Sequence, residues 1–210
     1  IRVNIGQWTP SFVIDIHNTS GSGPAFSVAT SDNENSVVLA SYFCQRQIVT
    51  DITLGSLMEC DFSCPTVTIE AGGAQDQAAD DTAYEGLKAI LSTRSLTRQR
   101  DMEMLHQPRR LEIHPSLTLA YLAYFDERYD VCIRPDIEKL NFGVTKKGTL
   151  LAHVSEKSYH KLRLDNGATT DAFFSWQNNE LFTNVDLKLF MVTSNPDIAK
   201  TDCLFYFVLA

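Results

Sequence analysis

The stretch SFVIDIHNTSGSGP at residues 11–24 decides the fold of this chain. Its first half, residues 11–17, is a run of apolar and β-branched side chains that is typical of a buried strand in a parallel sheet. Residues 18–24 are rich in Asn, Ser, Gly and Pro, and therefore predict a loop. Asp15 and His17 are two residues apart, so their side chains leave the same face of the strand near its carboxyl end, where open α/β sheets bind ligands.

A second junction of strand and loop occurs at residues 64–73, CPTVTIEAGG. A proline opens the β-branched strand and two glycines close it, with Glu70 at its end. A carboxylate that ends a buried strand is unfavourable unless it is paired, hydrated or used. A capping or ion-pairing role and a role as general acid and base are both open for Glu70.

The surrounding pattern predicts an α/β domain that is followed by a mainly β domain. Residues 25–29 resume the sheet, residues 36–49 fit the helical repeat, and residues 77–91 predict a helix that begins after the N-cap Asp76. Strand, glycine loop and helix in succession indicate an α/β domain. The composition turns polar over residues 98–110, so we expect domains at 1–105 and 106–210. Short strands are expected in the second domain at 117–121, 129–133, 149–154, 173–176 and 187–192.

Composition excludes several classes of protein. The chain has 210 residues, of which 44% are hydrophobic, and no apolar run approaches the length of a membrane span. A net charge of −8 does not suit binding to the phosphates of nucleic acid. Five cysteines without a CxxC spacing, and a start without a secretory pattern, predict a cytoplasmic protein. The chain does not begin with Met, so we expect a processed or partial chain.

The two junctions together resemble the signatures of the succinylglutamate desuccinylase and aspartoacylase family. Residues 15–19 resemble its D-x-H-N-T motif, and residues 65–73 resemble the motif that carries its catalytic glutamate. The resemblance implies an α/β fold, with a partial zinc-carboxypeptidase-like catalytic domain followed by a mainly β C-terminal domain. It also implies a zinc-dependent amide hydrolase, a deacylase that acts on a small N-acylated amino acid or a similar substrate.

The resemblance assigns roles to individual residues. His17 would be a zinc ligand, Asp15 would orient His17, and Glu70 would activate the metal-bound water. Asn18 and Tyr206 are weaker candidates for substrate binding, and a packing role in the last apolar strand is the more expected one for Tyr206. The expected partner is a small acylated molecule, and formation of a homo-oligomer stays open.

The chain departs from the family pattern in two ways. It lacks both the upstream H-x-x-E motif, which supplies two zinc ligands, and the Asn-Arg motif that follows it. No arginine precedes Glu70 closely, which argues against an aspartate-like or succinyl-like substrate. A catalytic zinc needs three protein ligands, and we expect the other histidines to be surface or packing residues. Without the missing ligands the hydrolase would be inactive or metal-poor. Two alternatives stay open: a non-catalytic binding or assembly module with a decayed metal site, and a metallocarboxypeptidase.

Overall fold

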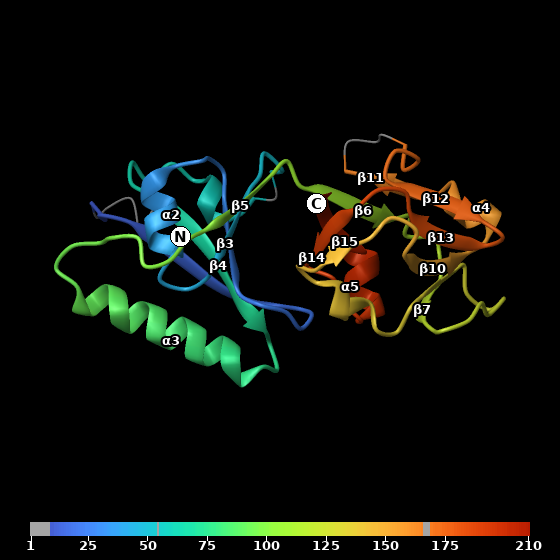
Figure 1. Cartoon of the computed structure of the whole chain (residues 1–210), viewed down its shortest axis with the longest axis horizontal. Helices are drawn as coiled ribbons and strands as arrows, with labels where there is room; N and C mark the ends of the chain where they lie inside the picture. The colour runs from blue at the N-terminus through green and yellow to red at the C-terminus, as the bar shows by residue number, and fades with distance from the viewer. Residues whose placement is uncertain (1–8, 54, 166–168) are drawn as a thin grey trace. The chain divides into compact units, whose positions relative to one another are not determined.

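The computed structural model describes residues 9–53, 55–165 and 169–210, and it divides into two compact units. Among the described residues, the first unit contains residues 9–19 together with Pro24–Pro108 (Figure 1). The second contains Arg109–Ala210 and also the short segment Ser20–Gly23. The chain therefore leaves the first unit after Thr19 and returns to it at Pro24, a path that a single boundary near residue 105 does not describe.

The first unit is built on a five-stranded mixed sheet. Its strands in spatial order are β1 (Val13–Thr19), β4 (Thr66–Gly73), β2 (Phe26–Ala29), β3 (Arg46–Val49) and β5 (Glu103–His106). All neighbours are parallel except β2 and β4. β2 runs antiparallel to β4, because the short link from β1 cannot form the long crossover that a parallel return needs.

Two helices cover one face of this sheet. They are α2 (Glu34–Ala40) and α3 (Gln77–Ser92). Leu39 and Ala40 of α2 and Ile90 of α3 pack in one cluster with Val67 and Ile69 of β4. The partly buried Ile14 and Ile16 of β1 join this cluster, which places odd-numbered β1 residues on the opposite face.

The helix expected over residues 36–49 is shorter than the pattern suggested. It ends at Ala40, and residues 46–49 instead form β3 between β2 and β5. The helix expected over residues 77–91 is confirmed as α3 (Gln77–Ser92). Asp76 occupies its N-cap, although its side chain accepts no capping hydrogen bond. A short 3-10 helix, η1 (Leu57–Glu59), precedes β4.

The second unit consists mainly of β-strands in two five-stranded sheets. One has the order β12 (Phe174–Gln177), β13 (Glu180–Thr183), β10 (Leu150–Val154), β8 (Val131–Ile133) and β7 (Leu119–Tyr121). The other has the order β11 (Leu162–Leu164), β6 (Arg109–Ile113), β15 (Phe205–Leu209), β14 (Leu187–Phe190) and β9 (Val144–Thr145). The remaining elements are η2 (Ile137–Leu140), α4 (Glu156–Tyr159) and α5 (Pro196–Thr201).

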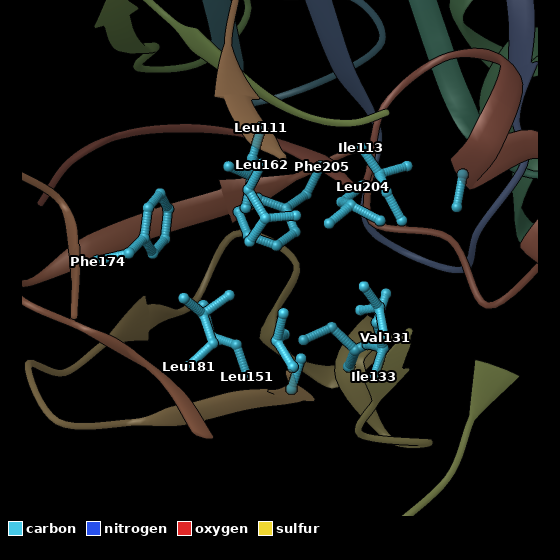
Figure 2. Packing of buried hydrophobic residues seen from close by; sticks show 14 of the residues in the cluster. Leu111, Ile113, Val131, Ile133, Leu151, Leu162, Phe174, Leu181, Leu204 and Phe205 are labelled. Atoms are coloured by element: carbon cyan, nitrogen blue, oxygen red, sulfur yellow. The ribbon is translucent and has the colours of Figure 1, made fainter. Parts of the chain in front are cut away.

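Side chains from both sheets form the core of this unit. Figure 2 shows Leu111, Leu162 and Phe205 of one sheet across from Leu151 and Leu181 of the other, in a single buried cluster. Burial of apolar surface on both inner faces stabilises the unit and accounts for the alternating pattern of its strands.

The described residues bear on two of the composition arguments. Among them, no helix is both long enough and apolar enough to cross a membrane. All five cysteines are free; Cys44, Cys132 and Cys203 are buried, and Cys60 and Cys64 are partly exposed. The buried thiols act as small apolar side chains in their cores.

Candidate functional site

The predicted site residues lie together on the first sheet. β1 and β4 run parallel, in a register that sets Asp15 opposite Thr68 and His17 opposite Glu70. Side chains alternate between the faces of a strand, so these four residues form a two-by-two block on the face opposite α2 and α3. The structure therefore brings His17 and Glu70 onto one face at the ends of adjacent strands, as the two motifs predict.

Asp15 and His17 form the closest polar contact of this block. Nε2 of His17 lies 2.8 Å from Oδ1 of Asp15. The His17 side chain is 53% exposed, while that of Asp15 is only 22% exposed. A carboxylate that accepts from Nε2–H fixes the neutral tautomer of the ring and leaves the lone pair on Nδ1. The pair thus presents one accessible imidazole nitrogen that can bind a metal ion.

A glycine bulge shapes β4 directly after Glu70. The register continues from His17 opposite Glu70 to Thr19 opposite Gly73, so β4 contains one more residue than β1 across this interval. Gly72 has a φ of 132°, a backbone conformation that favours glycine. Asn18 donates from its side-chain amide to the Gly72 carbonyl at 3.5 Å. The paired glycines of the motif therefore lie in a bulge immediately beyond the carboxylate, and β4 stays paired with β1 as far as Gly73.

Glu70 is half-buried, and its surroundings alter its acidity. Burial, which disfavours the charged form, raises the pKa of Glu70 above its ordinary value. The nearby His17 acts in the opposite direction and lowers the pKa, while the negative charge of Asp15 raises it. Glu70 thus lies within electrostatic reach of both residues, and a raised pKa makes its carboxylate a better proton acceptor than an exposed glutamate.

The segment after the D-x-H-N-T motif is held within the second unit. Ser22 N–H donates to Oε2 of Glu138 at 3.2 Å, and the Asn141 side-chain amide donates to the Ser22 carbonyl at 2.8 Å. Oδ1 of Asn141 also accepts from Val192 N–H at 3.0 Å. Glu138 and Asn141 were not predicted from the sequence, because the spacing of more than a hundred residues gives no local signal.

The weaker candidates lie elsewhere in the units. Tyr206 is 5% exposed in β15, where its ring stacks on Phe190 with centroids 5.7 Å apart and lies against the Arg110 guanidinium. Its packing role is evident, and a contact with substrate stays a prediction. The remaining histidines occur outside β1 and β4, at positions 106, 114, 153 and 160.

The described donor groups do not fit a zinc ion by themselves. Among residues 9–53, 55–165 and 169–210, no group of three or more His, Cys, Asp or Glu side chains could hold a metal. A catalytic zinc needs three protein ligands. His17, with Asp15 on its other nitrogen, can supply one of them.

A pocket of about 440 Å³ opens at the other edge of the same sheet. It is lined by Gln45, Arg46, Asp101, Met102 and Glu103, beside β3 and β5. The strand order separates it from β1, so it is not part of the Asp15–His17–Glu70 block.

Comparisons with known proteins identify the fold. No family model and no curated protein sequence matches the chain. Among solved structures, a succinylglutamate desuccinylase/aspartoacylase from Rhodobacter sphaeroides is 9% identical with a TM-score of 0.51, over 89% of this chain and 54% of that one. Murine aminoacylase 3 is 13% identical with a TM-score of 0.51, over 94% of this chain and 62% of that one. The product-bound ectoine utilization protein EutE (DoeB) from Ruegeria pomeroyi is 12% identical with a TM-score of 0.50, over 86% and 52%.

The chain thus spans about half the length of the EutE (DoeB) structure and of the Rhodobacter sphaeroides structure. The identities are low, so the likeness concerns the fold. It agrees with the resemblance that the two motifs indicate, and the mixed α/β architecture of this chain is that of the succinylglutamate desuccinylase/aspartoacylase structures.

Proposed function

We propose that this chain is part of a deacylase that hydrolyses a linear amide bond in a small N-acylated amino acid or a similar molecule. The observation that carries the proposal is the register of β1 and β4, which sets His17 opposite Glu70 on one face. Two motifs that lie about fifty residues apart in the sequence thereby form one site. The likeness to deacylase structures supports the same reaction class.

Glu70 is the proposed proton carrier. As a general base, its carboxylate takes a proton from the attacking water while the water oxygen bonds to the amide carbon. As a general acid, it then gives this proton to the leaving nitrogen while the carbon–nitrogen bond breaks. Burial raises the pKa of Glu70, which strengthens its carboxylate as a base, and the nearby His17 opposes this effect.

Zinc is the proposed cofactor, and His17 is the ligand that this chain contributes. The Asp15 carboxylate orients the ring through Nε2 and leaves Nδ1 for the metal. When bound, zinc would polarise the amide carbonyl and acidify its water. The other ligands belong, in this proposal, to polypeptide outside the present sequence, and residues 1–210 alone would be metal-poor and inactive. We propose a cytoplasmic location for the enzyme.

The test is Glu70→Gln in the full-length protein that contains this chain. We expect zinc content to stay at the wild-type level while hydrolysis of acylated amino acids is lost. His17→Ala should instead remove zinc and activity together. A panel of acylated amino acids and dipeptides would identify the substrate class, and turnover retained by Glu70→Gln would remove Glu70 from the mechanism.

A further inference from the structure

The fourth member of the two-by-two block, Thr68, has an unusual environment. It is only 6% exposed, and its hydroxyl oxygen has no hydrogen-bond partner in the described structure. Buried hydroxyl groups in proteins are nearly always paired, with protein or with ordered water. The Thr68 hydroxyl, which can both donate and accept a hydrogen bond, therefore calls for a partner that the protein groups around it do not provide.

The register shows which groups surround this hydroxyl. Thr68 lies opposite Asp15 on β1, and Glu70 follows it on the same face of β4. On its other side Thr68 is opposite Val28 of β2, which offers an apolar side chain. The polar neighbours of Thr68 within the block are thus the carboxylates of Asp15 and Glu70, together with the His17 ring that contacts Asp15. Carboxylates are acceptors when they are ionised.

A water molecule fits these groups better than a cation does. A buried water typically makes about three hydrogen bonds, and a hydroxyl with two carboxylates supplies that number. A cation would need more ligands than this corner offers, since the described residues contain no group of three or more potential His, Cys, Asp or Glu ligands.

We propose that the Thr68 hydroxyl binds a buried water molecule between the carboxylates of Asp15 and Glu70, and that this water holds both side chains in place. Thr68 is then a positioning residue for the block. The water site stands on burial and register alone, whereas its value for catalysis rests on the proposed function. Because alternate residues of a strand share a face, the position of Thr68 two residues before Glu70 is the sequence signal that could have revealed it.

Thr68→Val and Thr68→Ser in the whole chain test the proposal through thermal unfolding. Valine keeps the shape and removes the hydroxyl, so loss of the bridging water should lower the Tm by about 3 °C. Serine keeps the hydroxyl and should restore most of that loss. Thr145→Val is the matched control, because Thr145 is 3% exposed with an unpartnered hydroxyl but lies opposite Leu187 instead of a carboxylate. Its Tm should not fall.

Two further readouts separate positioning from simple packing. The ring ¹⁵N shifts of His17 should change in Thr68→Val and return in Thr68→Ser, since the water also orients Asp15. A high-resolution crystal structure should show the water in the wild type and not in Thr68→Val. An unchanged or higher Tm for Thr68→Val, or no water at Thr68 in the wild type, would overturn the proposal. None of these measurements depends on zinc or turnover, so they fail independently of the deacylase assignment.

Discussion

Nε2 of His17 lies 2.8 Å from Oδ1 of Asp15, two residues earlier on the same edge strand. Strand geometry alone produces this contact, because residues i and i+2 share a face. The carboxylate fixes which ring nitrogen carries the proton, and the exposed ring offers the other to a ligand. The local sequence pattern therefore places a carboxylate in contact with the imidazole that we propose as a metal ligand.

Asp15→Asn in the full-length protein should weaken zinc binding by about 10- to 100-fold, because a neutral amide no longer supports the charge and tautomer of the ligand ring. Competition with a chelator measures the affinity. The control is Asp51→Asn, an exposed carboxylate of the same unit. Equal zinc affinity in Asp15→Asn and the wild type would contradict the assigned role of Asp15.

Glu70→Gln should make the chain more stable at neutral pH. Burial raises the pKa of Glu70 above 4.5 in the folded state, so the folded protein binds its proton more tightly than the unfolded protein does. The stability that this proton supplies is full below pH 4.5 and is lost as pH rises through the folded-state pKa. Urea unfolding of both proteins at pH 4 and pH 7 measures the difference.

The gain from Glu70→Gln should therefore be clear at pH 7 and small at pH 4. A decrease in stability at pH 7 would show that the carboxylate is well paired in the folded state. A gain in stability on replacing Glu70 is also expected if Glu70 is a functional residue, because a half-buried carboxylate is unfavourable for folding.

Asp130 should stabilise the second unit, and its effect should be lost in acid. Its Oδ2 accepts from Thr118 N–H at 2.8 Å and from the Thr118 hydroxyl at 2.9 Å, and these bonds lower the pKa of Asp130. A lowered pKa contributes stability above 3.8 that disappears as pH falls through the folded-state value. Asp130→Ala should reduce the free energy of unfolding by about 1 kcal/mol at pH 7.

The effect of the same substitution should become smaller in acid, as the wild-type carboxyl takes up its proton. Glu127→Gln, at an exposed neighbouring position, is the control and should be neutral at pH 7 and in acid. A difference between Asp130→Ala and the wild type that stays constant as the pH falls would argue against stabilisation by the ionised carboxylate.

The placement of the candidate site residues on one face could be predicted from the sequence better than the strand order of the sheet could. Asp15, His17 and Glu70 each end or nearly end an apolar strand, and that signal is local. The insertion of β4 between β1 and β2 is a long-range pairing that no local pattern records.

The strands β3 and β5 could not be predicted from the sequence, because they contain polar residues. Gln47 is fully buried in β3, and its side-chain amide donates to the Ser36 hydroxyl. Arg46 pairs with Glu103 across to β5. Polar residues satisfied by neighbouring elements do not look like a buried strand in the sequence, which is why residues 46–49 suggested a helix instead.

Gly21→Ala and Gly23→Ala should differ sharply, although both glycines lie in the loop that follows the D-x-H-N-T motif. The sequence alone gives them the same role, since each allows close approach of the backbone. In the structure, a Cβ at Gly21 would lie 2.1 Å from the Val192 carbonyl oxygen, a contact that requires the backbone to move. A Cβ at Gly23 would meet Asn141 atoms at 3.5 Å or more, which is ordinary van der Waals contact.

Gly21→Ala should therefore reduce the free energy of unfolding by about 1–3 kcal/mol, while Gly23→Ala should be nearly neutral. Gly21→Ala should also speed amide hydrogen exchange at Ser22, whose N–H donates to Glu138, and at Val192, whose N–H donates to Asn141. Urea unfolding and exchange mass spectrometry measure the two effects. Equal stability of the two variants would mean that segment 20–23 is not held against Val192.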